Sequence, residues 1–335
     1  MTLAVIVPVY NGGSDLQQCL AGIAASTRRP DRVVVVDDGS TDDAMLSVRE
    51  FGYECLVLED GPKGPARARN RGARFVTDAD ILVFVDADVV VHPGTIELME
   101  WYLRDKPGVA AVFGSYDDMP AERNVPSLYK NLLHHHTHQI GKGDASTFWA
   151  GCGAVRRVVF EAVGGFDETY TRPSIEDIEL GLRMTRSGYR IRLCPDLLAT
   201  HLKRWTVTGL IRTDILARAL PWSRLIVERD AFINDLNLSA TQRLAALAAL
   251  MVMVSGFTSI WYPVGATLIC AAALGVFVAV NRGLFELFFR AGGVRLVFGG
   301  AVLHLIYYCY SAVVFSLVRL NTLLHPGQRR LADLT

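Results

Sequence analysis

The sequence predicts an α/β domain with a mostly parallel central sheet, followed by an all-α region that spans a membrane. Short apolar segments rich in β-branched residues alternate with segments of helical periodicity, as in parallel sheets with crossover helices. The expected strands are residues 3–9, 33–37, 54–58 and 81–86, and the expected helices are about 14–26, 42–51 and 65–76. The chain is 51% hydrophobic with a mean hydropathy of +0.26, which is too apolar for an ordinary soluble protein.

The first helix is predicted from its apolar spacing and its start signal. Its expected buried face consists of residues at helical intervals, Leu16, Cys19, Leu20 and Ile23. Ser14 and Gln17 have the spacing of a capping box, which predicts where the helix begins. Right-handed crossovers place the carboxyl ends of the parallel strands at one edge of the sheet, where such folds bind ligands. The polar residues that follow each strand are therefore candidates for a site.

Two long segments without Asp, Glu, Lys or Arg predict helices that cross a membrane. The first, residues 244–280, is too long for one span of about 20 residues, and Pro263 with Gly265 divides it. The expected spans are residues 244–262, 264–280 and 296–318. None of them has the polar face that a helix at a protein surface would show. The expected domains are a catalytic domain over residues 1–235, a membrane region over 236–320 and a tail over 321–335.

The segment between the second and third spans combines phenylalanines with arginines. It predicts a short interfacial helix near residues 283–291, with its arginines at the lipid headgroups. Three spans that start in the cytoplasm place the tail outside, whereas the basic residues near the C-terminus favour the inside, namely Arg319, Arg329 and Arg330. Both orientations of the tail therefore stay open.

Charge and cysteine usage exclude several classes of protein. The chain has 34 basic and 34 acidic residues, so its net charge of zero gives no indication of a nucleic-acid partner. No basic leader precedes residues 3–9, so we expect the catalytic domain to stay in the cytoplasm. The six cysteines contain no C-x-x-C pair, which fits reduced thiols and argues against a zinc ribbon.

Two carboxylates follow the fourth expected strand, in Asp86-Ala87-Asp88. Residues two apart in a strand face the same side, so we expect Asp86 and Asp88 to point together. A cation between them would make their repulsion tolerable, and Mg²⁺ or Mn²⁺ binds carboxylate oxygens and shares such sites with substrate phosphates. The pair thus predicts a metal site that holds a phosphorylated substrate. The alternative is a solvated turn after a strand.

Two other polar clusters end strands at the same edge. They are Pro8-Val9-Tyr10-Asn11 after the first strand and Asp37-Asp38-Gly39-Ser40 after the second. Each cluster alone has the composition of a turn or a helix cap, but three at one edge indicate a site. Arg69 lies in the first turns of an arginine-rich helix and suits phosphate. Its neighbours fit a solvated basic face instead, namely Arg67, Arg71 and Arg74.

Later segments add candidates for binding and proton transfer. Gly151-Cys152-Gly153 lies in a strand-like segment whose glycines permit close approach of a ligand. Glu176 and Asp177 open a helix, where the dipole favours ionised acids, and one of them could be a general base at a cleft. Four histidines include a pair at i, i+4 spacing that could bind metal, but we favour a cleft lining or a membrane surface for them: His134, His135, His136 and His138.

Taken in order, these motifs resemble an inverting family 2 glycosyltransferase of the GT-A fold, over about residues 1–235. The resemblance rests on VIVPVYN, VVVVDDGS, GPARARNRG, the DAD motif, GCGAVRR, GGFDE and IEDIELGLR. A single D-x-D is a weak signal, whereas this ordered series is specific. The implied fold is a Rossmann-like catalytic domain with transmembrane helices after it.

The resemblance also implies roles for individual residues. Tyr10 would stack on the nucleotide base and Asp38 would hydrogen-bond it, while Arg69 would lie near the ribose or diphosphate. Asp88 would bind the metal, and Asp86 would contact the ribose or the waters of the metal. The remaining implied residues are Asp177 with Glu176 as the base, His201 as a further metal ligand, and Pro8, Asn11, Gly151, Cys152, Gly153, Arg204 and Trp205 in substrate binding.

The implied activity is transfer of a sugar from a nucleotide-diphosphate sugar, most commonly a UDP-sugar, with Mg²⁺ or Mn²⁺. The acceptor would be a hydroxyl of a lipid-linked or cell-envelope glycan, and the protein would be integral to a bacterial inner membrane. Polymer-extending synthases carry Q-x-x-R-W where this chain has His201-x-x-Arg204-Trp205, which argues against processive synthesis.

Two alternative functions also fit parts of the sequence. The segment around Asp86 satisfies the D-x-D signature of haloacid-dehalogenase-type phosphatases, in which Asp86 would be the nucleophile. That alternative leaves the Tyr10-Asn11 and Asp37-Asp38 clusters without a role. The other alternative is a glycosyltransferase whose acceptor is a polyprenyl phosphate.

Overall fold

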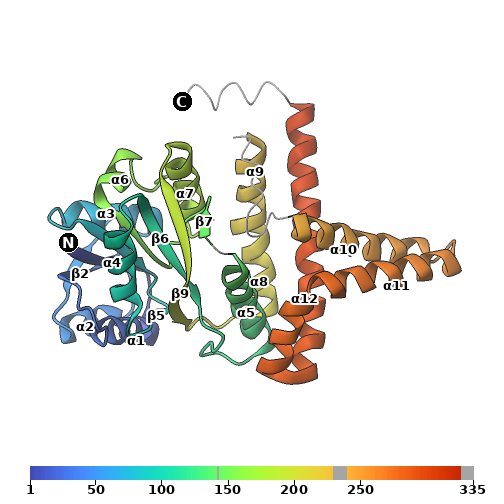
Figure 1. Cartoon of the computed structure of the whole chain (residues 1–335), viewed down its shortest axis with the longest axis horizontal. Coiled ribbons are helices and arrows are strands. Elements are labelled where there is room, and N and C mark those ends of the chain that lie inside the picture. The colour runs from blue at the N-terminus through green and yellow to red at the C-terminus, as the bar shows by residue number, and fades with distance from the viewer. Residues whose placement is uncertain (142, 229–239, 326–335) are drawn as a thin grey trace. The chain divides into compact units, whose positions relative to one another are not determined.

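The computed structural model describes residues 1–141, 143–228 and 240–325 (Figure 1). The chain forms two compact units. The first comprises Met1–Glu122 and His138–Arg204, and the second comprises Arg123–Thr137 and Trp205–Thr335. The expected domain boundary at residues 235 and 236 and the last ten residues of the expected tail, 326–335, lie outside the described residues.

The first unit is built on one mixed sheet (Figure 1). Its strands are β1 Leu3–Val9, β2 Arg32–Asp37, β3 Glu54–Val57, β4 Ile81–Val85, β5 Val89–Val91, β6 Val109–Tyr116, β7 Gly143–Ala145, β8 Cys152–Arg156 and β9 Arg190–His201. Their order is β3-β2-β1-β4-β8-β6-β9-β5, with β7 also paired to β9. Strands β1 to β4 are mutually parallel and β6 is parallel to β9, whereas β5, β7 and β8 pair antiparallel. The predicted mostly parallel sheet is confirmed.

Helices cover both faces of this sheet. They are α1 Gly13–Ala24, α2 Ala44–Glu50, α3 Pro65–Phe75, α4 Thr95–Asp105, α6 Arg157–Ala162 and α7 Glu176–Arg186. On one face, alternate β1 residues such as Val5 join the core with Leu20 of α1 and Met99 of α4. On the other face, a Cβ on Gly72 of α3 would lie 2.5 Å from Ile6 of β1. The absence of a side chain at Gly72 therefore lets α3 lie close to the sheet.

One local prediction in this unit is wrong, and one strand ends a residue earlier than expected. Helix α1 begins at Gly13 after an N-cap at Gly12, and no side chain caps it, so Ser14 and Gln17 form no capping box. Strand β4 ends at Val85, because the N–H of Val89 donates to the carbonyl of Asp86 at 3.0 Å and closes a turn. The buried face expected for α1 is confirmed, with Leu16, Cys19, Leu20 and Ile23 all buried.

The second unit is helical. Its elements are most of α5 Val125–Ile140, then α8 Val207–Thr213, η1 Asp214–Ala219, α9 Leu220–Glu228, α10 Ala240–Thr258, α11 Pro263–Val280 and α12 Arg282–Leu324. Helices α10, α11 and α12 are long and apolar enough to cross a membrane. The division before α11 falls at Pro263, as the sequence predicted.

The short helix expected near residues 283–291 corresponds to the first part of α12, residues 282–291, and its place at a membrane surface stays a prediction. The backbone leaves helical geometry inside α12 at Gly292 and Gly293, where φ is −154° and 64°. Leu284, Phe285 and Phe288 of this first part are buried in the core of the second unit, whereas Phe289 remains exposed. The expected third span, residues 296–318, thus lies after the kink, and the expected short helix lies before it.

Candidate functional site

The guanidinium of Arg69 joins two carboxylates in the interior of the first unit. Its Nη2 donates to Asp86 at 2.6 Å, and its Nη1 donates to Oε1 of Glu176 at 3.0 Å. Only 3% of Arg69 is exposed, and the guanidinium lies 5.3 Å from the centroid of the Phe166 ring. Arg69 is therefore held by carboxylates on either side.

Three separate segments supply this buried group: α3 supplies Arg69, the turn after β4 supplies Asp86, and α7 supplies Glu176. The N–H of Asp86 donates to the carbonyl of Gly151 at 3.1 Å, and Oε2 of Glu176 accepts the N–H of Ser174 at 2.8 Å. Each carboxylate is thus fixed by the backbone as well as by Arg69. Asp88 lies two residues after Asp86, and Asp177 lies directly after Glu176. The fixed carboxylates therefore also set the positions of Asp88 and Asp177.

Asp86 and Asp88 turn toward different partners. Because β4 ends at Val85, the expectation that they share one face of a strand is wrong. Asp86 reaches Arg69, whereas Oδ2 of Asp88 lies 3.8 Å from Nε2 of His201 and 3.8 Å from Nζ of Lys203. In the described part of the chain, no three His, Cys, Asp or Glu residues are grouped so that they could hold a metal ion.

Asp88 and His201 nevertheless fit a divalent cation that takes its remaining ligands from water and substrate. Burial alone would raise the pKa of Asp88, but the contacts with His201 and Lys203 outweigh it and lower the pKa to about 2. Asp88 is thus an ionised oxygen donor beside an imidazole nitrogen. Hard divalent cations accept such donors and complete their shell with waters and phosphate oxygens.

The Tyr116 ring at the end of β6 holds His201 of β9 in place. The Tyr116 ring stacks on the imidazole with centroids 4.3 Å apart and planes 14° apart, and Trp149 meets Tyr116 edge-on at 4.8 Å. Asp117, directly after Tyr116, accepts a hydrogen bond from the hydroxyl of Thr200. Its Oδ2 also lies 2.9 Å from Nε2 of His92. Tyr116 and Asp117 were not predicted from the sequence, because pairing between the ends of β6 and β9 leaves no local motif.

Asp177 is a partly accessible carboxyl with two backbone partners. Its Oδ2 accepts the N–H of Ala150 at 3.2 Å, and its Oδ1 accepts the N–H of Ile178 at 2.8 Å. Burial, with the neighbouring charge of Glu176, raises the pKa of Asp177 to about 7. The helix dipole therefore does not keep this carboxyl fully ionised at neutral pH, contrary to expectation. A carboxyl with such a pKa can accept a proton near pH 7.

Asp38 retains one acceptor atom without a partner. Its Oδ2 accepts the backbone N–H groups of Lys63 at 2.9 Å and Gly64 at 2.7 Å. Its Oδ1 is buried and has no hydrogen-bond partner among the described residues. A buried acceptor in this state suits a ligand N–H, such as that of a nucleobase. Tyr10 follows Val9, whose carbonyl accepts the N–H of Asp38 at 2.8 Å, and it is 50% exposed and available for stacking.

The other residues predicted at the site are mostly part of the framework. Pro8 is buried in β1, and Cys152 and Gly153 of β8 pair with Val85 and Phe84 of β4. Asn11 has a positive φ of 53°, and its Oδ1 accepts the N–H of Thr41 at 2.8 Å, which joins two loops. Arg204 is exposed and pairs with Glu122 at 3.2 Å. Trp205 is buried in the core of the second unit.

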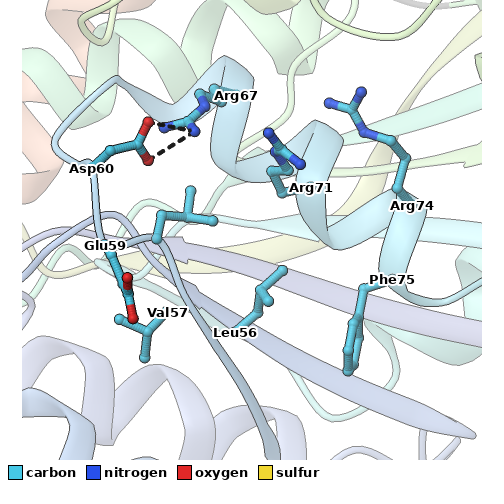
Figure 2. Close-up of a pocket in the computed structure, with 9 residues that line it drawn as sticks. Leu56, Val57, Glu59, Asp60, Arg67, Arg71, Arg74 and Phe75 are labelled. Carbon is cyan, nitrogen blue, oxygen red and sulfur yellow. Dashed lines mark hydrogen bonds and ion pairs between the residues drawn. The ribbon is translucent and has the colours of Figure 1, made fainter.

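The other arginines of α3 lie on its outer face. Figure 2 shows Arg67, Arg71 and Arg74 along a shallow hollow of about 520 Å³ that Leu56 and Phe75 also line. Arg67 pairs with Asp60 at 2.8 Å, and Arg74 pairs with Glu168 at 2.6 Å. The distinction drawn from the sequence between Arg69 and this basic face agrees with the structure.

One histidine of the segment on α5, His138, packs inside the protein. Nδ1 of His138 lies 2.8 Å from the carbonyl of Gly114, and its ring meets Phe113 and Trp149 edge-on. His138 is buried, so it contributes to the core of the first unit.

Comparison with known proteins yields one family. The model of glycosyl transferase family 2 matches residues 4–164. Glycosyltransferase AglE of Haloferax volcanii is 30% identical over 217 residues, which cover 60% of this chain and 67% of AglE. The O-antigen chain rhamnosyltransferase RfbN of Salmonella typhimurium is 25% identical over 246 residues, which cover 69% of this chain and 76% of RfbN.

One solved structure is similar over most of the chain. Mannosyltransferase PcManGT from Pyrobaculum calidifontis, solved in complex with GDP-Man and Mn²⁺, aligns with a TM-score of 0.57. The alignment covers 95% of this chain and 86% of that one at 20% identity. At this identity the likeness establishes the fold, which is that of the GT-A enzymes.

Replacing Arg69 tests whether the buried ion pairs hold the site together. We expect Arg69→Met to lower the free energy of unfolding by about 3–5 kcal/mol, because Asp86 and Glu176 would stay buried without their cation. The matched control is Arg71→Met on the exposed face of α3, which should cost less than about 0.5 kcal/mol. Thermal unfolding of both variants in detergent measures the difference. Equal melting temperatures would show that Arg69 does not support the fold.

Proposed function

Because the chain belongs to glycosyl transferase family 2, we propose that it is a membrane-anchored, metal-dependent, inverting glycosyltransferase. It takes a sugar from a nucleotide-diphosphate donor and transfers it to a hydroxyl of a lipid-linked cell-envelope glycan. The observation that carries this proposal is Asp177, a partly accessible carboxyl whose pKa is raised to about 7. Such a group can remove the proton of an acceptor hydroxyl at the moment of attack.

The proposed donor site follows from Asp38 and Asp88. Asp38 offers its unpartnered Oδ1 to a nucleobase N–H, and the exposed ring of Tyr10 stacks on the base. Asp88 and His201 would hold Mg²⁺ or Mn²⁺, which supplies charge neutralisation for the departing diphosphate. Lys203, 3.8 Å from Asp88, adds positive charge on the same side. The name of the similar rhamnosyltransferase suggests a deoxysugar donor as an alternative to the UDP-sugars expected from the family.

In the proposed reaction, Asp177 accepts the proton of the acceptor hydroxyl as the hydroxyl oxygen attacks the anomeric carbon. The bond from that carbon to the diphosphate breaks in the same displacement, so the anomeric configuration inverts. Arg69 acts as a positioning residue, because its guanidinium is committed to Asp86 and Glu176. Glu176 is buried and bound to Arg69, which makes Asp177 the better candidate for the base.

The membrane assignment rests on α10, α11 and α12, each apolar enough to span a bilayer. An anchor in the same chain as the transferase domain suits an acceptor that itself resides in the membrane. We therefore propose a lipid-linked acceptor at a bacterial inner membrane, with the catalytic domain on the cytoplasmic side. The phosphatase alternative loses support, because the family assignment accounts for the clusters at Tyr10 and Asp38 that it left without a role.

Chelation should abolish the activity if Asp88 holds the metal. We expect EDTA to stop sugar transfer and Mn²⁺ or Mg²⁺ to restore it, because the diphosphate then regains its counter-charge. Calorimetry should show that Asp88→Ala weakens metal-dependent binding of the donor found by a nucleotide-sugar screen. His201→Ala should raise the Mn²⁺ concentration needed for half-maximal activity. Unchanged metal-dependent binding by Asp88→Ala would exclude this metal site.

Asp177→Asn tests the base while keeping the shape of the side chain. Turnover should fall by about 10²–10⁴-fold with little change in donor affinity, because only proton transfer is lost. Glu176→Gln, measured in parallel, is the matched control for the neighbouring position. Full turnover by both variants would contradict a hydroxyl acceptor activated by a carboxylate. That result would favour transfer to a polyprenyl phosphate, whose oxygen needs no base.

The rate should depend on pH through the raised pKa of Asp177. Since the ionised carboxyl is the active form, kcat/KM should be level above about pH 8 and fall tenfold per pH unit below about pH 6. A pH profile at saturating metal measures this limb. A profile that stays level down to pH 5 would show that no group with a pKa near 7 acts as the base.

A further inference from the structure

A hollow of about 300 Å³ lies at the kink of α12, entirely within the second unit. Two short segments form it: the start of α5 with the residues just before it, and the kink itself. Its lining residues are Arg123, Asn124, Val125, Leu128, Ala291, Gly292, Arg295 and Leu296. None of the proposed donor or base residues is among them, so this hollow is distinct from the site described above.

The kink exists because two glycines interrupt the helix. Gly293 has a φ of 64°, which side chains rarely tolerate, and a Cβ on Gly292 would lie 2.8 Å from Leu296. The break frees the carbonyl of Ala291, which accepts a hydrogen bond from Nη2 of Arg123 at 2.9 Å. Arg123 is therefore fixed at the rim of the hollow by one of its five N–H groups, and four remain for a ligand.

The charge of the hollow is not balanced by its own lining. Its two ionisable residues are both arginines, and no described residue that lines it is acidic. Arg295 is exposed and forms no ion pair or hydrogen bond with any described residue. Two guanidiniums that share a hollow without a carboxylate suit a phosphate group, which they can grip through paired hydrogen bonds.

The other walls are apolar. Leu128 and Leu296 are buried side chains, and Val125 packs against α12, since a Cβ on Gly299 would lie 2.8 Å from it. Beyond the kink, α12 continues as a candidate membrane span. A ligand with its phosphate at the arginines could therefore lay a hydrocarbon chain along apolar helix surface. This combination is the chemistry of a phosphorylated lipid.

We propose that this hollow binds the phosphate groups of a lipid, and that the lipid is the polyprenyl diphosphate that carries the acceptor glycan. The identity of the lipid rests on the proposed function, because a lipid-linked acceptor is part of it. The arginines bind the diphosphate and the apolar walls receive the first isoprene units. The hollow thereby selects acceptors by their lipid carrier rather than by their sugar.

The test is binding of undecaprenyl diphosphate to the full chain in phosphatidylcholine nanodiscs, followed by native mass spectrometry. We expect Arg295→Gln to weaken binding about tenfold, and Arg123→Gln combined with it to weaken binding further, because each removes a charge-assisted contact. The matched control is Arg290→Gln, an exposed arginine of the same helix outside the hollow, which should bind as the unmodified chain does. Unchanged binding by the double variant would overturn the proposal.

Competition identifies the ligand. Free pyrophosphate and phosphatidylglycerol should displace undecaprenyl diphosphate poorly, because each lacks either the lipid chain or the second phosphate. Equal displacement by phosphatidylglycerol would overturn the acceptor assignment, and equal displacement by pyrophosphate would overturn the lipid requirement. Binding that depends on Arg295, found together with full turnover by Asp177→Asn, would show that the proposed chemistry fails while the lipid-phosphate site stands.

Discussion

The buried guanidinium of Arg69 is the interaction on which the candidate site depends. A single charge this deep in a protein is costly to desolvate, and its burial is stable only with opposite charges and hydrogen bonds around it. Asp86 and Glu176 supply both, at 2.6 and 3.0 Å. Since the three residues come from α3, the turn after β4 and α7, one cation fixes the mutual positions of segments more than 100 residues apart in sequence. Asp88 and Asp177 are placed as neighbours of these fixed carboxylates.

The parts of the fold that could be predicted are those that depend on the pattern of residues within a single helix or strand. Apolar β-branched runs gave β1 to β4 within a residue or two, and uncharged segments gave α10 and α11, because burial and the bilayer both select side chains along a single element. Tyr116 stacked on His201 could not be predicted this way. It depends on β6 lying parallel to β9, a pairing that joins distant residues through backbone hydrogen bonds and leaves no periodic mark.

The failure of prediction at Asp86 has its physical origin in the backbone. The D-x-D motif looks like the end of a strand, but the hydrogen bond from Val89 to the carbonyl of Asp86 turns the chain, so each carboxylate meets a different cation. In α12, by contrast, the short helix and the span predicted from the sequence are two helical parts that the non-helical Gly292 and Gly293 separate. At Asp86 the deciding interaction thus lies in the backbone, where side-chain patterns carry little information.

The two carboxyl groups proposed for chemistry are driven apart in pKa by their surroundings. Burial by itself raises the pKa of both carboxyl groups, because it favours the neutral acid. For Asp88, contacts with His201 and Lys203 reverse the effect and lower the pKa to about 2, so it stays ionised as a metal ligand must. For Asp177, Glu176 adds negative charge and the nearest cation, Arg69, is shared with two other carboxylates, so the pKa rises to about 7. The different neighbours of Asp88 and Asp177 thus separate an ionised carboxylate from a proton acceptor, and that separation allows two aspartates of one domain to serve different steps of one displacement.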